Sequence, residues 1–254
     1  MFEITGFHKK ITELILDAPA PGKHCARNAI SNLKKAWEIR ELDPEMAAFR
    51  AITGEEEAAT AIMYSLRRRR YKGAEKLKYR DHTYKAAVFP FFQAISSVFA
   101  RHLELYKATI EIDTKVKKPT LKVRINVPCP TGDIVHAYPE PPLHFEMMVN
   151  GKLYDFSREL EELATTKNVK KITDYIKQQA NTRNVILYAS TKGIPKIERP
   201  PIDNFLERKR DIVFGHLVIY LLIDPHKEHQ LFVQQALTAF LKMLNAVPKD
   251  ITFE

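Results

Sequence analysis

Apolar side chains recur at steps of three and four residues through most of residues 1–105, which is the period of an amphipathic helix. One apolar stripe runs over Ala26–Trp37 and a second over Phe49–Leu66. Asp43-Pro44 precedes the second stripe and is typical of a helix start, because aspartate caps free N–H groups and proline suits the first helical position. A third helix is expected over Asp81–Leu103. The pattern therefore predicts a helical N-terminal region.

The period changes from helical to alternating after residue 108. Apolar and polar side chains alternate over 110–113 and 121–127, as in half-buried antiparallel strands. Another strand is expected at 145–149, where Asn150-Gly151 favours a two-residue hairpin into 152–156. Residues 106–156 are therefore expected to form a small antiparallel β region.

The pattern becomes mainly helical again in residues 157–254. The elements expected there are helices at 157–165, 168–180 and 227–245 and a strand at 185–188. Residues 211–223 are ambiguous, because their Val, Ile and Tyr favour a strand while the charged run upstream favours a helix, and we prefer the helix. The predicted fold class is α+β, with a C-terminal mixed region whose last helices pack back on the N-terminal bundle.

The composition excludes several broad classes of protein. Of 254 residues 45% are apolar, which excludes a wholly disordered chain, and two cysteines exclude a disulfide scaffold. The first ten residues lack the layout of a signal peptide, and the longest apolar run, Ile212–Ile223, is short for a membrane helix. We therefore expect a cytoplasmic protein without a membrane partner.

Metal and cofactor motifs do not stand out in the sequence. There is no glycine-rich phosphate loop and no HExxH or GxSxG motif. His226 and His229 form an HxxH pair, but they lie at an expected turn without a neighbouring cluster of carboxylates. We expect no metal and no other cofactor.

A glutamate interrupts the apolar stripe of the second helix. Alternating steps of three and four from Phe49 reach position 56, which is Glu56, flanked by Glu55 and Glu57. A buried carboxylate is costly unless it is paired, so the stripe predicts a cationic partner. The candidate partners are Arg27 and His24 on the first helix and His82 and Lys85 at the start of the third. The alternative is a slightly rotated helix whose three glutamates face solvent.

Three short segments around these glutamates carry a family resemblance. Residues 26–33 contain Asn-Ala, residues 47–58 an alanine-rich Glu-Glu pair, and residues 80–85 a His-x-x-Lys element. Over about 24–100 the chain resembles the HEPN superfamily, and most closely its AbiV-like branch, which is associated with abortive infection against phage. The resemblance implies a helical bundle, a homodimer or another protein partner, and, in catalytic members, metal-independent endoribonuclease activity in antiviral defence.

Catalytic HEPN proteins use an arginine and a histidine four to six residues apart on one helix, where imidazole supplies acid–base chemistry and guanidinium binds the scissile phosphate. Arg210 and His216 are the match in this chain, and they are the catalytic candidates. The alternative is structural, with His216 packed in an apolar segment and Arg210 at its solvated end.

A strongly basic segment spans residues 67–80, between the second and third expected helices, with tyrosines interleaved. Cations attract a phosphate backbone, and tyrosine rings stack on unpaired bases. The alternative is a solvated helix C-terminus, where the helix dipole favours cations. The predicted nucleic-acid-binding residues are Arg67, Arg68, Arg69, Arg70, Lys72, Lys76, Lys78 and Arg80.

Three functions remain compatible with the sequence. The first is a HEPN-like protein of phage defence that binds or cleaves RNA. The second is a non-catalytic interaction or regulatory module, and the third is a basic nucleic-acid-binding protein of a mobile element. The net charge of +9 suits a nucleic-acid partner but does not distinguish among these three functions.

Overall fold

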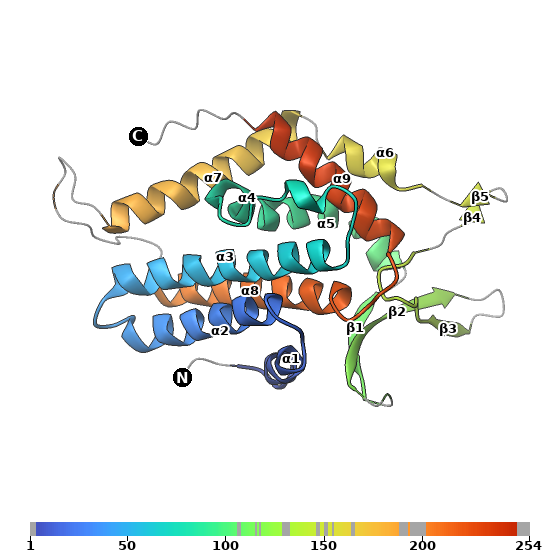
Figure 1. The fold of residues 1–254 in the computed structure, drawn as a ribbon, viewed down its shortest axis with the longest axis horizontal. Coiled ribbons are helices and arrows are strands. Elements are labelled where there is room, and N and C mark those ends of the chain that lie inside the picture. Colours follow the sequence, from blue (N-terminus) through green and yellow to red (C-terminus); the bar gives the residue numbers. More distant parts are fainter. Residues whose placement is uncertain are drawn as a thin grey trace.

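The structure is a computed structural model that describes most of the chain. The described residues are 4–105, 108–114, 116, 118–128, 133–145, 148–149, 152–153, 155–163, 166–187, 193 and 202–247. Within them the chain forms the predicted α+β fold, which combines a bundle of helices with a small antiparallel sheet and C-terminal helices (Figure 1).

The N-terminal region is helical, as predicted. Its elements are α1 (Gly6–Leu16), α2 (Gly22–Ile39), α3 (Pro44–Arg68), the 3-10 helix η1 (Ala74–Lys76), α4 (His82–Ala86) and α5 (Val88–Leu105). The long α3 helix begins at the predicted signal, because the Asp43 side chain accepts a hydrogen bond from the Met46 N–H at 2.9 Å. The third expected helix is divided into α4 and α5 at Ala87.

Small residues allow α2 and α3 to lie close together. A Cβ at Gly54 of α3 would lie 3.1 Å from the carbonyl oxygen of Ala29 in α2, so glycine permits this approach. Ala26, Ala51 and Ala58 are fully buried in the same two helices. This close approach at Gly54 fixes the position of α3 at the residue just before Glu55.

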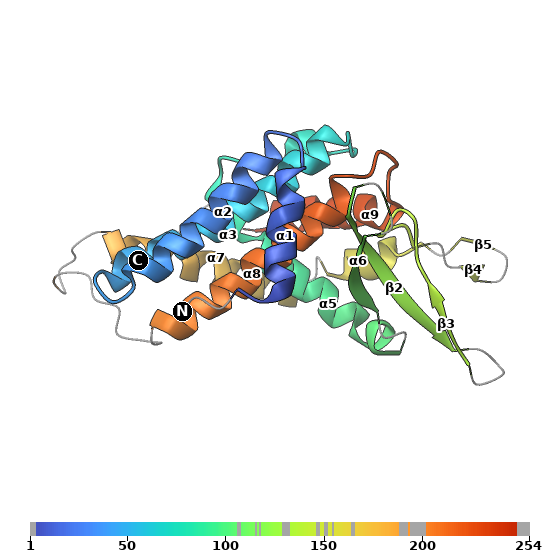
Figure 2. The same cartoon turned by 90° about the horizontal axis from the view of Figure 1, so that it is seen from below.

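The C-terminal third returns to the bundle. It forms α6 (Ser157–Glu162), α7 (Thr166–Leu187), α8 (Ile202–Ile223) and α9 (Leu231–Ala246). Helix α8 runs beside α3, while α4, α5, α7 and α9 lie on one side of this pair (Figure 1). Helix α1 packs on both α2 and α8 and crosses them in Figure 2. The preferred interpretation of 211–223 as a helix is therefore confirmed.

One expectation for the C-terminal third is wrong, and one expected helix is present but shorter. Residues 185–187 do not form the strand expected at 185–188. Instead α7 continues through Leu187 and buries Ile186 against Ala48 and Ile52 of α3. Helix packing therefore outweighs the β propensity of this short run. The helix expected at 157–165 ends at Glu162, and its start is stabilised by the Asp155 carboxylate, which accepts a hydrogen bond from the Ser157 N–H at 2.9 Å.

A three-stranded antiparallel sheet lies at one end of the bundle (Figure 1). It is formed by β1 (Thr109–Asp113), β2 (Thr120–Pro128) and β3 (Ile134–Ala137), in that order. Ile112 pairs with Leu121 and Ile110 with Val123, and Leu121 and Val123 face the core. The sequence did not predict β3, all of whose residues are exposed and carry no burial pattern.

The predicted hairpin around Asn150-Gly151 is present as two short paired strands. They are β4 (Met148–Val149) and β5 (Lys152–Leu153), with Val149 opposite Lys152. The two turn residues themselves lie outside the described residues.

Candidate functional site

The acidic residues of α3 are not a solvated face. Glu55 is 2% exposed, and its carboxylate lies 2.5 Å from Nζ of Lys209 on α8. The Tyr175 hydroxyl of α7 donates a hydrogen bond of 2.8 Å to the same carboxylate. Burial, and then the Glu55 charge, raise the pKa of Tyr175, so this phenol stays protonated. The Glu55 carboxylate therefore connects α3 with α8 through Lys209 and with α7 through Tyr175.

Glu56 makes a second, more accessible contact. Its carboxylate lies 2.8 Å from Nδ1 of His82 and 3.1 Å from Nζ of Lys85, both on α4. Arg183 of α7 adds a guanidinium nitrogen at 3.1 Å. Glu56 and Lys85 are buried, whereas the side chain of His82 is 58% exposed. The cluster therefore begins in the core and ends at the surface.

The third glutamate of α3, Glu57, faces Cys25 of α2. It is partly exposed and lies beside the Cys25 thiol. Burial, and then the nearby Glu57 charge, raise the pKa of Cys25 to about 12. The thiol is therefore protonated at neutral pH and is a poor nucleophile.

The sequence identified part of this cluster. Of the predicted partners His82 and Lys85 contact Glu56. Arg27 and His24 are exposed and form no ion pair with the glutamates among the described residues. The sequence analysis missed Lys209, Tyr175 and Arg183. The pattern that indicated Glu56 also applies to Lys209: a charged residue interrupts an apolar stripe, here the buried stripe Leu206–Lys209–Val213 of α8.

His82 has the arrangement of a proton-transfer group. Its Nδ1 faces the Glu56 carboxylate and also lies 2.7 Å from a guanidinium nitrogen of Arg183. A carboxylate that holds one ring nitrogen orients the imidazole, and the exposed part of the ring stays in contact with solvent. Together with two neighbouring cations, such a ring can exchange a proton with an anion bound at the surface.

The first three arginines of the basic segment are structural. Arg67 donates hydrogen bonds to the carbonyl oxygens of Ala74, Glu75 and Leu77. Arg68 pairs with the buried carboxylate of Asp224, at 2.9 Å. Arg69 donates to the Asp224 carbonyl oxygen from two of its nitrogens. These contacts close the turn after α3 and attach it to the end of α8.

The other five cations of the segment point to solvent. Arg70, Lys72, Lys76, Lys78 and Arg80 are exposed, and within the described residues none of them has a carboxylate at ion-pairing distance. The predicted nucleic-acid-binding set is thus divided into three structural arginines and five free cations.

Two tyrosines stand beside the free cations. Lys78 lies over the ring of Tyr84 and Arg80 near the ring of Tyr79, and both rings are partly exposed. Tyr71 is different, because its ring is buried and stacks on His229. Tyr84 and Tyr79, which also packs on the partly exposed Tyr64, are therefore aromatic side chains of this surface.

The structure does not bring Arg210 and His216 to a common site. The Arg210 guanidinium pairs with Asp211 at 3.0 Å. Burial, and then the nearby Arg210 charge, lower the pKa of His8. His216 is 2% exposed, and its ring packs edge-on against Phe92, with ring centroids 5.6 Å apart. Burial lowers the pKa of His216 to about 4, so the ring is neutral at pH 7. The placement of His216 corresponds to the structural alternative, whereas the Arg210 side chain is only 16% exposed and does not lie at a fully solvated end.

The described residues contain no group of three or more acidic, histidine or cysteine side chains arranged to hold a metal ion. In the same part of the chain, no helix is long and apolar enough to cross a bilayer. Comparisons with protein-family models, with curated proteins and with solved structures found no match to this chain.

We expect Lys209→Met to destabilise the protein strongly. The variant leaves Glu55 buried without its cation, and removal of one partner from a buried ion pair costs about 3–5 kcal/mol. Urea unfolding monitored by circular dichroism measures this loss. The double variant Glu55→Gln with Lys209→Met removes the charge as well and should recover most of it. A free energy of unfolding of Lys209→Met within about 1 kcal/mol of the wild-type value would show that the pair is not important for stability.

His216 should make the folded protein sensitive to mild acid. Its pKa is 6.5 in the unfolded chain and about 4 in the folded protein, so between these values the unfolded chain binds a proton that the folded protein does not. The free energy of unfolding should therefore fall as pH decreases from 6.5 to 4, by up to about 1.4 kcal/mol per pH unit from this group. Urea unfolding at several pH values should show a shallower dependence for His216→Phe. Parallel curves for the two proteins would refute a buried neutral imidazole.

Proposed function

We propose that this chain is a HEPN-like protein of the phage-defence kind that binds single-stranded RNA through the free cations of its basic turn. The observation that supports the proposal is the group of five exposed cations, Arg70, Lys72, Lys76, Lys78 and Arg80, without carboxylate partners in the described residues. The family resemblance over 24–100 favours RNA as the nucleic acid.

The chemistry of the turn suits a single strand. Free cations bind phosphates and release counterions, which makes binding depend on salt. Tyr79 and Tyr84 place aromatic rings among these cations, and such rings stack on unpaired bases. Arg67, Arg68 and Arg69 form hydrogen bonds within the protein and stabilise the turn. In this proposal the later cations of the segment bind the RNA.

Removal of four free cations should weaken RNA binding. The variant Lys72→Ser, Lys76→Ser, Lys78→Ser, Arg80→Ser avoids the structural arginines. We expect at least a tenfold loss of affinity for a fluorescein-labelled 20-nucleotide RNA, measured by anisotropy in 100 mM salt. The slope of log affinity against log salt should decrease by up to about 3, since single-strand binding loses about 0.7 per phosphate contact.

The control carries the same charge change elsewhere. Lys9, Lys10, Lys34 and Lys35 are exposed on α1 and α2, and all four are changed to serine. This variant should bind the RNA within about threefold of wild type, because only net charge has changed. Equal losses in the two variants would show that net charge, rather than the turn, holds the RNA.

Metal-independent RNA cleavage is a second candidate function, and a specific arrangement favours it. The exposed imidazole of His82 is held by Glu56 and lies beside Arg183, next to the basic turn. In this proposal His82 takes a proton from a ribose 2′-hydroxyl, whose oxygen attacks the adjacent phosphorus and forms a 2′,3′-cyclic phosphate. The bond between phosphorus and the 5′-oxygen breaks, and the 5′-oxygen takes a proton from water. Arg183 binds the charge of the phosphate.

If RNA is cleaved at this cluster, His82→Ala should abolish cleavage of the labelled RNA in EDTA while changing its affinity less than threefold. Arg210→Ala is the matched test of the other candidate site and should leave the cleavage rate unchanged. Cleavage that persists in His82→Ala would exclude this role for His82. No cleavage by wild-type protein would leave binding as the function.

A further inference from the structure

The cluster of Glu56, His82, Lys85 and Arg183 has more cationic groups than its carboxylate neutralises. Among the described residues, Glu56 is the carboxylate at ion-pairing distance from Lys85, from Arg183 and from Nδ1 of His82. Lys85 is buried and neutralises Glu56 from the interior. The cluster therefore carries one net positive charge with a neutral imidazole and two with a protonated imidazole.

The nearest other carboxylates are engaged elsewhere. Glu55 pairs with α8, and Glu57 faces α2. Asp81 caps the start of α4, because its carboxylate accepts a hydrogen bond from the Thr83 N–H at 2.9 Å. Within the described part of the chain, none of these three carboxylates lies at ion-pairing distance from Arg183. The excess positive charge is therefore left for a ligand.

Arg183 presents unused donors to solvent. Its Nη1 faces Glu56 and His82, whereas Nε and Nη2 have no hydrogen-bond partner among the described residues. Both of these nitrogens are accessible, because the buried side-chain nitrogens without a partner in this part of the chain do not include them. The N–H groups of Nε and Nη2 are parallel, and such a pair matches two oxygens of one phosphate group.

The second ring nitrogen of His82 is free as well. Nδ1 is held by Glu56, while Nε2 makes no hydrogen bond with a described residue and the side chain is 58% exposed. A protonated ring donates from both nitrogens, so Nδ1–H binds Glu56 and Nε2–H is available to an anion. Because Nδ1 lies 2.7 Å from Nη1 of Arg183, the free donors of the two side chains are neighbours at the surface.

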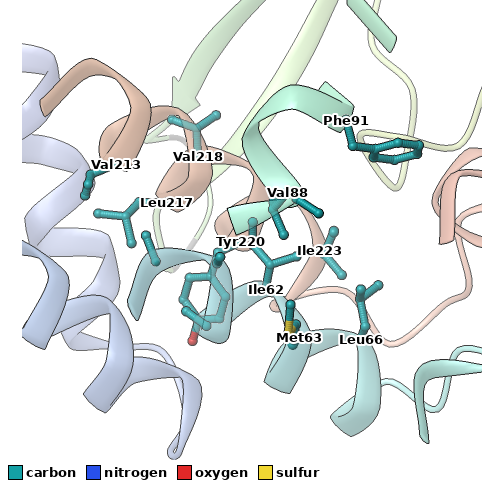
Figure 3. Close-up of a cluster of buried hydrophobic side chains, with 14 of the residues drawn as sticks. Ile62, Met63, Leu66, Val88, Phe91, Val213, Leu217, Val218, Tyr220 and Ile223 are labelled. Atoms are coloured by element: carbon teal, nitrogen blue, oxygen red, sulfur yellow. The ribbon is translucent and has the colours of Figure 1, made fainter. Parts of the chain in front are cut away.

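The backbone that carries these donors is anchored in the hydrophobic core. Figure 3 shows Ile62 and Met63 of α3 in one buried cluster with Val88 and Phe91, which lie at the start of α5 just after α4. On α7, Ile186 is buried against α3 three residues after the arginine. The site therefore exists before a ligand binds, which lowers the cost of ordering it.

We propose that Arg183 and His82 form a binding site for a phosphate monoester, namely the terminal phosphate of the bound RNA strand. The inference rests on the proposed RNA binding, and it is an alternative to cleavage at the same cluster. Arg80, a free cation of the basic turn, stands two residues before His82, so a strand held by the turn reaches the site.

Charge distinguishes the end of a strand from its interior. A phosphate monoester carries a charge of about −1.5 to −2 at pH 7, which balances the cluster when the imidazole is protonated. A phosphodiester inside the strand carries one negative charge and leaves one positive charge of the protonated cluster uncompensated. The terminal phosphate is therefore the better electrostatic match.

The first experiment compares RNAs that differ in one terminal phosphate. One pair of 20-nucleotide strands, labelled with fluorescein at the 3′ end, carries a 5′-phosphate or a 5′-hydroxyl, and a second pair, labelled at the 5′ end, carries a 3′-phosphate or a 3′-hydroxyl. In anisotropy titrations in 100 mM salt, wild type should bind the phosphorylated strand of one pair at least about fivefold more tightly than its hydroxyl partner, because charge-assisted hydrogen bonds add to its binding.

The two proposals fail in different ways in this experiment. Equal affinities within both pairs would overturn the phosphate site and leave RNA binding by the basic turn in place. Absence of binding to all four strands would overturn the proposed function and this inference with it.

The second experiment locates the phosphate. Arg183→Gln removes the guanidinium, and its preference for the phosphorylated strand should fall below about twofold, whereas Arg183→Lys keeps the charge without the paired N–H groups and should retain only part of the preference. Lys177→Gln is the matched control, because Lys177 is exposed on the same helix and loses the same charge, and it should retain the full preference. A folded Arg183→Gln protein with the full preference, or an equal loss in Lys177→Gln, would overturn the proposal.

Inorganic phosphate provides a test on wild-type protein alone. At about 50 mM it should abolish the preference for the phosphorylated strand, whereas sodium chloride of the same ionic strength should weaken both strands of a pair equally. A preference that is the same in phosphate and in chloride would exclude a phosphate-binding site.

Discussion

The arrangement of the bundle depends on the neutralisation of two adjacent carboxylates inside it. Successive side chains of a helix point about 100° apart, so Glu55 and Glu56 face different neighbours. Glu55 meets Lys209 of α8, while Glu56 meets α4 through Lys85. Helix α7 supplies a partner to each through Tyr175 and Arg183. Two residues of α3 therefore fix its orientation towards three other helices.

These contacts contribute more to specificity than to net stability. Removal of two charges from water offsets much of their attraction, and well-packed apolar residues often replace a buried ion pair without loss. A packing of α7 or α8 that left either carboxylate unpaired would nevertheless be strongly penalised. The buried Asp224 carboxylate acts in the same way just after α8, where it pairs with Arg68, while Arg69 donates to the Asp224 backbone carbonyl oxygen.

Much of the fold could be predicted from local pattern, and the remainder depends on contacts distant in sequence. Asp43-Pro44 gave the start of α3, and the alternation over 121–127 indicated β2. The apolar stripe through Glu56 implied a buried carboxylate, and the same logic applied to Lys209 would have supplied the partner of Glu55. No local pattern shows that Arg68 and Arg69 bind Asp224, more than 150 residues away.

The spacing of Arg210 and His216 along one helix does not place their side chains in one site. Six residues correspond to about 600° of rotation, so the two side chains lie about 120° apart around α8 and face different surroundings. Arg210 lies near His8, whereas His216 packs against Phe92. Spacing alone could not show which of the two residues is buried.

Buried ionisable side chains of the bundle avoid an uncompensated charge in two ways. Among the buried acidic and basic side chains of the described residues, Glu55, Glu56, Lys85, Lys209 and Asp224 each have an oppositely charged partner. His216 lies on the same helix as Lys209 and near Glu55, but burial keeps its ring neutral, so it carries no charge that needs an oppositely charged partner. Among the described residues, the bundle therefore avoids uncompensated buried charge by ion pairing at five positions and by loss of the proton at His216.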